Sequence, residues 1–212
     1  MSLTVKARPV DESASGLLVR ELRLHPAIAR ILAGRGILNP NDARSFLSPS
    51  PYILHDPYLL PGMRAAVERL NQALENKEKI LVHGDYDADG LTSTALLTQA
   101  FGALGAKVEY FIPNRLDEGY GLNREGIERA LSIGAKLIVT CDCGTSSRDE
   151  IDYATSLGID TIVTDHHEPE PPLPVAVAII NPKLPDSDYP FRGLAGVGVA
   201  MKLVMALLES RG

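Results

Sequence analysis

The sequence predicts an α/β fold, in which a parallel β-sheet carries helices on both faces and a short helical N-terminal extension precedes it. From about residue 63, helical and strand-like patterns alternate at short spacing. The strand-like segments are near-continuous apolar runs, which is typical of strands buried on both faces. Residues 1–62 show helical patterns and a proline-rich segment instead. We therefore expect a helical extension over residues 1–62 and an α/β domain over residues 63–212.

The extension contains two short amphipathic patterns. Residues 25–37 and 39–47 have helical spacing, and Asn39 or Asn41 is a plausible cap for the second helix. Residues 48–62 hold four of the fifteen prolines, which predicts a loop.

The main domain follows in regular order. Residues Val67, Leu70 and Leu74 have helical spacing, whereas residues 79–85 begin with a short apolar run that predicts a buried strand. The same reasoning predicts helices over residues 63–76, 91–105, 123–134, 147–158 and 199–209, and strands over residues 79–85, 107–113, 136–142, 160–165 and 175–182.

Composition bounds the function. The chain has 212 residues, of which 45% are hydrophobic and 23% charged, as in ordinary globular proteins. The apolar stretch over residues 197–208 is too short for a membrane span and is interrupted by Lys202. The N-terminus lacks the apolar core of a signal peptide, so we expect a cytoplasmic protein. We also expect no membrane association and no organic cofactor. The cysteines, Cys141 and Cys143, are expected to be buried, reduced thiols.

The formal charge of the chain is −6. This value counts against a domain that holds nucleic acid by electrostatics alone. It is compatible with an enzyme that acts on phosphates through a metal, because bound divalent cations reverse the local charge.

Charged clusters follow three of the predicted strands. They are His83 with Asp85, Asp87 and Asp89; then Asp142; and then Asp165, His166 and His167. Because parallel strands end at the same edge of a sheet, we expect these clusters to converge there. Several carboxylates in one crevice would repel one another, and divalent cations such as Mn²⁺, Mg²⁺, Fe²⁺ or Zn²⁺ would remove that repulsion. A shared carboxylate could then bridge two ions.

Each cluster also has a purely structural interpretation when taken alone. Asp89 could cap a helix that begins at Leu91, Asp142 could be a turn residue, and two adjacent histidines are common in surface loops. The occurrence of all three clusters at successive strand ends favours a metal site.

The sequence resembles the DHH phosphoesterase superfamily, and within it the RecJ family of single-stranded-DNA exonucleases. The resemblance rests on the ordered series HGDYDADGLTSTALL, FIPNR, EGYGL, TCDCGTSS, TDHHEP, NPK and FRGLAGVGVAMKL, which extends over about residues 80–203. Such a long ordered series is highly specific, although each short motif alone is not.

The resemblance implies a two-ion site for Mn²⁺ or Mg²⁺. It implies that Asp142 bridges the ions, that His167 lies outside the ligand set or near the phosphate, and that Asp165 orients the histidines. Asp85 stays open as a ligand or as a neighbour of one. The implied ligands are His83, Asp87, Asp89, Asp142 and His166, of which Asp87, Asp89, Asp142 and His166, with His167, would form the catalytic set.

Three further features each have two interpretations. Arg115 follows a strand and could hold a substrate phosphate, or could form a surface ion pair with Asp117 or Glu118. Tyr120 could stack on a base or could pack within its loop. The segment GLAGVG, residues 193–198, is expected to be a close-packed turn into a helix, with a backbone-to-phosphate role as the weaker alternative.

The resemblance implies 5′→3′ exonuclease action on single-stranded DNA in repair and recombination. Alternatives are a phosphodiesterase for short oligonucleotides or cyclic dinucleotides, and a non-catalytic scaffold. The sequence stops before a fourth acidic motif of the family, so we expect an N-terminal fragment with an incomplete second ion site and low activity. Single-stranded DNA would then be bound through the full-length protein, with single-strand-binding or helicase proteins as possible partners.

Overall fold

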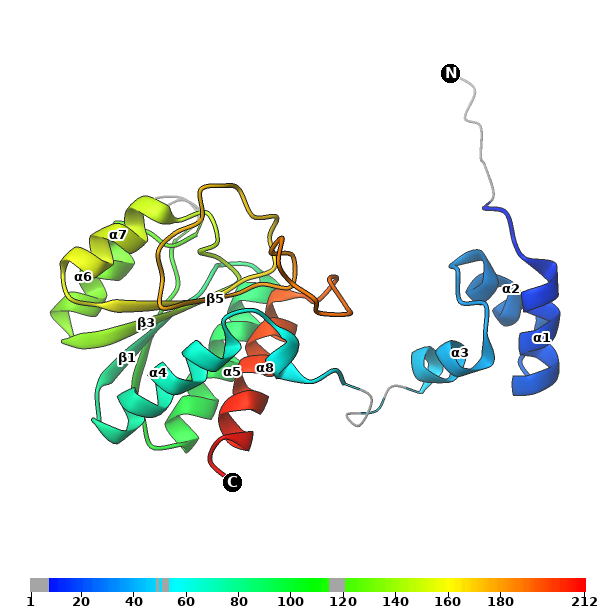
Figure 1. Cartoon of the computed structure of the whole chain (residues 1–212), viewed down its shortest axis with the longest axis horizontal. Helices are drawn as coiled ribbons and strands as arrows, with labels where there is room; N and C mark the ends of the chain where they lie inside the picture. Colours follow the sequence, from blue (N-terminus) through cyan, green and yellow to red (C-terminus); the bar gives the residue numbers. More distant parts are fainter. Residues whose placement is uncertain (1–7, 49, 51–53, 115–120) are drawn as a thin grey trace, which may run out of the picture. The chain divides into compact units, whose positions relative to one another are not determined.

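The computed structural model describes residues 8–48, 50, 54–114 and 121–212. The chain forms two compact units, Met1–Leu54 and His55–Gly212. We describe each unit by itself (Figure 1).

The smaller unit contains three helices, α1 (Glu12–Leu22), α2 (Pro26–Gly34) and α3 (Pro40–Leu47). Its core consists of Leu18, Ala29, Leu32 and Ala43. The backbone N–H of Asp42 donates to the Asn39 side chain, so Asn39 rather than Asn41 caps α3. Helix α1 was not predicted from the sequence, and its N-terminus is capped by the Asp11 carboxylate.

The larger unit is an all-parallel five-stranded sheet with the strand order β2-β1-β3-β4-β5. This arrangement confirms the predicted fold class. The strands are β1 (Lys79–His83), β2 (Lys107–Phe111), β3 (Ala135–Cys141), β4 (Asp160–Thr164) and β5 (Ala178–Ile180). The helices are η2 (Pro57–Leu59), α4 (Met63–Glu75), α5 (Ala88–Ala103), α6 (Arg124–Ser132), α7 (Arg148–Ser156) and α8 (Gly196–Glu209).

Two helical layers cover the sheet (Figure 1). Successive residues of a strand point to opposite faces, so Ile80 and Val82 pack with α4, α5 and α8, whereas Leu81 packs with α6 and α7. Each face therefore has its own hydrophobic core, which explains why the central strands β1 and β3 are mostly apolar, whereas the edge strand β2 is partly exposed.

The division between the units lies earlier than the predicted boundary between residues 62 and 63. Residues 55–62 belong to the larger unit. The Tyr58 hydroxyl donates to the carbonyl of Ala206, and the buried Lys202 ammonium donates to the carbonyl of His55. These bonds attach the segment to α8, although its prolines led us to predict a loop.

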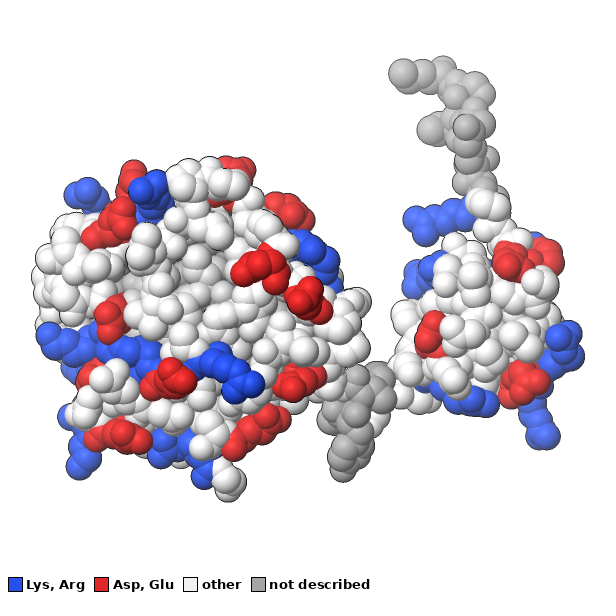
Figure 2. All heavy atoms as spheres, in the orientation of Figure 1, with Lys and Arg blue, Asp and Glu red and all other residues white. Residues whose placement is uncertain are grey.

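Charge is mixed on the surface of the larger unit. On the face seen in Figure 2, acidic and basic side chains are interspersed rather than gathered by sign. Among the helices of the described residues, none combines the length and the apolar character that crossing a bilayer requires.

Candidate metal centre

The clustered acids and histidines lie where β1, β3 and β4 end. The chain leaves β1 to form β2 on one side and later returns to form β3 on the other side of β1. In sheets of this order, the crevice beside that reversal is the usual ligand site. Asp85 follows β1, and Asp142 follows β3, so both lie at this position.

The loop after β1 presents three carboxylates. Asp85 is buried, and its Oδ1 accepts a hydrogen bond from the N–H of Tyr86. Asp87 is the N-cap of α5, because its Oδ1 accepts the N–H groups of Asp89 and Gly90 at 2.8 and 3.0 Å. The bond from Gly90 contributes most to lowering the pKa of Asp87 below its usual value. Asp87 therefore has the capping role that the structural interpretation gave to Asp89, and α5 begins at Ala88 rather than at Leu91.

Asp89 instead binds the N-terminus of another helix. Its two carboxylate oxygens accept the N–H groups of Gly196 and Val197, each at 2.7 Å. The carboxylate thereby serves as the cap of α8, for which no side chain of its own N-terminal residues provides a cap.

Asp142 is held in an unusual environment. Its backbone φ angle is 63°, in the left-handed region, and only 1% of the residue is exposed to solvent. Burial, with the charges of Asp89 and Asp87, raises the pKa of Asp142 to about 7. A buried carboxylate that is this costly to ionise is typical of functional sites, and a bound cation would compensate its charge.

His166 faces these acids. Its Nδ1 lies 3.0 Å from the carbonyl of Leu194. A carbonyl only accepts, so Nδ1 carries a proton, and in the neutral ring the lone pair is on Nε2. Nε2 lies 3.1 Å from Oδ1 of Asp142 and 3.6 Å from Oδ2 of Asp89. A lone pair aimed at carboxylate oxygens is repulsive unless a proton or a metal ion lies between them, so the donor set fits a divalent cation.

Asp165 is buried beside the second histidine. Its Oδ1 accepts the ring Nδ1–H of His167 at 2.7 Å, and its Oδ2 accepts the N–H of Thr145 at 2.9 Å. Burial alone would raise the pKa of Asp165, but these bonds outweigh it and lower the pKa to about 2. The same contact with Asp165 raises the pKa of His167.

Asp165 was expected to orient both histidines. It binds the ring of His167, but it contacts only the backbone N–H of His166, whose ring is oriented by Leu194. The role of Leu194 was missed because a backbone carbonyl has no signature in the residue type.

Within the described residues, two groups of side chains could hold a metal ion. One consists of Asp85, Asp87 and Asp142, and the other of Asp142, His166 and His167. The ligand atoms of each group lie within 4.8 Å of one another, and Asp142 belongs to both. The geometry of the site is thus compatible with two neighbouring ions that share one carboxylate.

His83 does not belong to either group. It shares the face of Leu81, where its ring lies 5.3 Å from the ring of Phe111 and against the backbone of Gly126. Its place among the ligands stays a prediction. Arg115 and Tyr120 lie outside the described residues.

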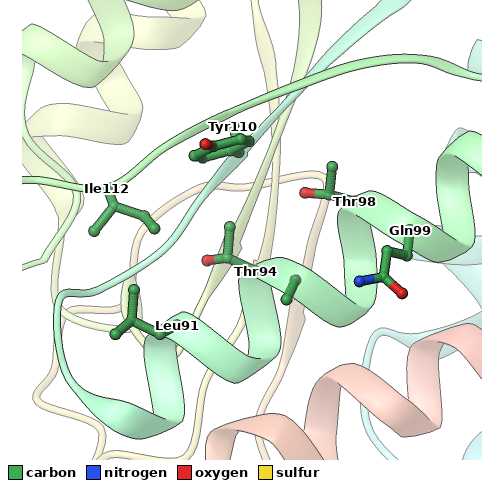
Figure 3. Close-up of a pocket in the computed structure, with 7 residues that line it drawn as sticks. Leu91, Thr94, Thr98, Gln99, Tyr110 and Ile112 are labelled. Atoms are coloured by element: carbon green, nitrogen blue, oxygen red, sulfur yellow. The ribbon is translucent and has the colours of Figure 1, made fainter.

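Two hollows lie in the larger unit, and only the first of them is lined by residues of the candidate site. One, of about 300 Å³, is lined by Ser146, Ser147, Glu150 and His167, among others. The other, of about 340 Å³, lies between α5 and β2, where Leu91, Tyr110 and Ile112 surround it (Figure 3). Cys141 and Cys143 are buried, free thiols behind the site, and burial raises the pKa of Cys141 to about 12.

Comparison with protein families gives one match over most of the larger unit. The model of the DHH family, N-terminal domain, matches residues 79–211.

Curated relatives are longer proteins. Single-stranded-DNA-specific exonuclease RecJ of Bacillus subtilis (strain 168) is 43% identical over 198 residues, which are 93% of this chain and 25% of that protein. The protein of the same name from Escherichia coli (strain K12) is 44% identical over 207 residues, 97% of this chain and 34% of its own length. The chain thus spans about a quarter to a third of these relatives.

Solved structures give the same result. A crystal structure of exonuclease RecJ bound to manganese has a TM-score of 0.65 and 43% identity, and covers 72% of this chain and 39% of its own. RecJ from Thermus thermophilus in complex with Mn²⁺ has a TM-score of 0.75 and 33% identity, and covers 98% and 28% respectively.

Proposed function

This chain belongs to the DHH family, and from that premise we propose that it is the catalytic part of a metal-dependent exonuclease that degrades single-stranded DNA. The observation that carries the proposal is the position of Asp142 in both candidate metal groups, at the edge where the strands end. The names of the relatives, which are single-stranded-DNA-specific exonucleases, support the substrate class.

We propose Mn²⁺ or Mg²⁺ as the cofactor, since relatives have been solved with these ions. Asp85 and Asp87 would hold one ion and His166 the other, with Asp142 between them. When bound, the ions supply positive charge for a phosphoryl group and lower the pKa of a nucleophilic water. His83 and Asp89 are further proposed ligands.

Hydrogen bonds within the chain orient the two histidine rings of this site. Leu194 fixes the His166 ring with Nε2 toward the acids. Asp165 holds the proton on Nδ1 of His167, so that the Nε2 edge is presented on the opposite side of a ring that is 47% exposed. We infer that this edge of His167 contacts the substrate phosphate. Arg115 and Tyr120 are proposed to bind the phosphate and a base of the same strand.

The biological setting is part of the proposal. We infer 5′→3′ digestion during DNA repair and recombination, in the cytoplasm, with single-strand-binding or helicase proteins as partners. The acidic charge of the chain is consistent with DNA binding that depends on bound cations rather than on a basic surface.

The first test is metal binding. Titration calorimetry with Mn²⁺ compares the parent chain with Asp142→Ala and with a matched control, Asp149→Ala, which removes an exposed carboxylate from the first turn of α7. We expect Asp142→Ala to lower the affinity by at least about a hundredfold, because both groups lose a ligand. Equal affinity of Asp142→Ala and the parent would exclude the shared-ligand arrangement.

The second test is activity. Digestion of an end-labelled single strand is compared with that of the matching duplex, with Mn²⁺ or with EDTA. We expect only weak digestion of the single strand by this fragment, dependent on metal and lost in Asp142→Ala but retained in Asp149→Ala. Digestion that persists in EDTA would contradict the proposed chemistry.

A further inference from the structure

We propose that the turn over residues 194–197, which leads into α8, positions the metal-binding side chains, and that Gly196 is the positioning residue at its centre. This inference rests on the proposed function, because it concerns how the same site is held in shape. Three separate contacts carry it, and each involves a different side chain of the site.

The first contact sets the direction of a histidine. The carbonyl of Leu194 accepts the proton on Nδ1 of His166 at 3.0 Å. This bond selects the tautomer in which Nε2 is the coordinating atom, and it aims Nε2 toward Asp142 and Asp89. Metal-binding histidines generally need such a partner on the other ring nitrogen, and here a backbone carbonyl supplies it.

The second contact fixes a carboxylate. The N–H groups of Gly196 and Val197 each donate to one oxygen of Asp89, both at 2.7 Å. Because each oxygen has its own donor, the carboxylate cannot rotate without losing a bond. The first turn of α8 also offsets part of the negative charge. These N–H groups are therefore engaged by the protein, which argues against the backbone-to-phosphate role considered for this segment.

The third contact is steric. A Cβ added at Gly196 would lie 2.5 Å from Oδ1 of Asp142 and 2.9 Å from its Cβ and Cγ. Real Cβ atoms do not approach other heavy atoms so closely, so any larger residue would displace the Asp142 side chain. Gly196 is thus required because the buried carboxylate that belongs to both metal groups rests directly on its backbone.

The turn can hold these groups because α8 is firmly anchored. Val199, Leu203 and Leu207 are fully buried in the core beneath the sheet. The three side chains themselves come from separate parts of the chain: the loop after β1, the end of β3 and the loop after β4. A single rigid turn that contacts all three is a simple way to fix their mutual geometry.

The test uses Gly196→Ala and a control in the same segment, Gly193→Ala. The nearest atoms to a Cβ at Gly193 would be ring atoms of Phe191, at an ordinary distance of 3.5 Å or more. We expect Gly196→Ala to lower Mn²⁺ affinity at least tenfold by calorimetry, and Gly193→Ala to change it less than twofold. Thermal unfolding in EDTA, measured on the same samples, shows whether a loss of affinity in Gly196→Ala occurs while the chain remains folded.

A second measurement does not depend on a variant. In the unaltered chain, ¹⁵N spectra of the histidine rings, recorded with and without Mg²⁺, should show His166 protonated on Nδ1, with Nε2 deprotonated when the ion is bound. A proton on Nε2 with a bare Nδ1 would overturn the role of Leu194, even if Gly196→Ala fails to fold.

The outcomes separate this inference from the proposed function. If the unaltered chain does not bind Mn²⁺, the proposed metal centre fails. If the unaltered chain binds Mn²⁺ and Gly196→Ala binds it equally well, the metal centre stands and only the positioning role is wrong.

Discussion

Much of the free-energy cost of forming the candidate metal site falls on one residue, Asp142. It is buried, its backbone is left-handed, and its carboxyl has a pKa of about 7 because of burial and of the neighbouring carboxylates Asp89 and Asp87. Strained, hard-to-ionise residues of this kind are typical of functional positions. We therefore expect the ionised Asp142 carboxylate to lower the free energy of unfolding of the metal-free chain.

The pH dependence of that cost can be predicted. An aspartate in the unfolded chain ionises near pH 4, whereas Asp142 in the fold ionises near pH 7. Between these values the folded state binds more protons, so the metal-free stability contributed by this group falls as the pH rises from about 4 to 7. We expect Asp142→Asn, which also tolerates the left-handed backbone, to raise the free energy of unfolding at pH 8 by about 2–4 kcal/mol.

Urea unfolding in EDTA at pH 8 and at pH 4.5 checks this expectation. The gain of Asp142→Asn should be largest at pH 8 and nearly absent at pH 4.5, and Asp149→Asn should show no such gain. Excess Mn²⁺ should reverse the order, because only the parent is stabilised by mass action. A gain that does not depend on pH would show that the carboxyl is not the source of the cost.

At the residue scale, the sequence indicated which side chains come together but not how they are oriented. Strand ends and residue types were enough to bring together Asp85, Asp87, Asp142, His166 and His167. The carbonyl that orients His166, and the contacts of the His83 ring with Phe111 and Gly126, depend on packing that the sequence pattern does not specify.

At the scale of the element, α5 combines a structural and a proposed chemical role in one residue. Asp87 caps the helix through one oxygen, Oδ1, and belongs to the group with Asp85 and Asp142. The structural interpretation and the metal interpretation of this cluster are therefore compatible, and one carboxylate can serve in both.

Two substitutions separate these roles. Asparagine is as good an N-cap as aspartate, so Asp87→Asn should keep the stability of the metal-free chain within about 0.5 kcal/mol, whereas Asp87→Ala should lose about 1 kcal/mol. Both variants should bind Mn²⁺ at least tenfold more weakly. Chemical denaturation and calorimetry on the same samples provide the two readouts. Unchanged Mn²⁺ affinity in Asp87→Asn would show that Asp87 caps the helix but does not bind the metal.

Helix starts were the least predictable feature of the elements. The helix after β1 begins three residues before the predicted Leu91, and α8 begins at Gly196 instead of Val199. The cap of α8 is Asp89, which is distant in sequence, so no local pattern marks this start. The apolar periodicity that defines the middle of each helix is local, and it was predicted correctly from Met63 onward.

At the scale of the whole molecule, the two units differ in charge. Residues 1–54 contain seven Lys and Arg against four Asp and Glu, a formal charge of +3, and residues 55–212 contain fourteen against twenty-three, a formal charge of −9.

The fold class followed from the sequence because the alternation of helices and buried strands is repeated along about 150 residues. The boundary between the units did not, since it depends on which residues pack on α8.

The packing of the described residues predicts which shortened chains will fold. None of their buried core clusters combines residues from both units. A chain of residues 55–212 should therefore keep its melting temperature within about 3 °C of the parent, where about 1 kcal/mol corresponds to a few degrees. Its affinity for Mn²⁺ should stay within twofold.

A chain of residues 63–212 is the matched control, because it begins at the boundary that the sequence predicted. It would lose the Tyr58 hydroxyl bond to Ala206 and the carbonyl of His55, and Lys202 would remain in the core without that acceptor. A buried polar group that loses its partner costs about 1–3 kcal/mol and a charged group more, so this chain should melt at least about 5 °C below the 55–212 chain. Calorimetric melting of the two chains decides between the boundaries: equal melting temperatures would show that residues 55–62 contribute nothing to the larger unit, and would move its start to residue 63.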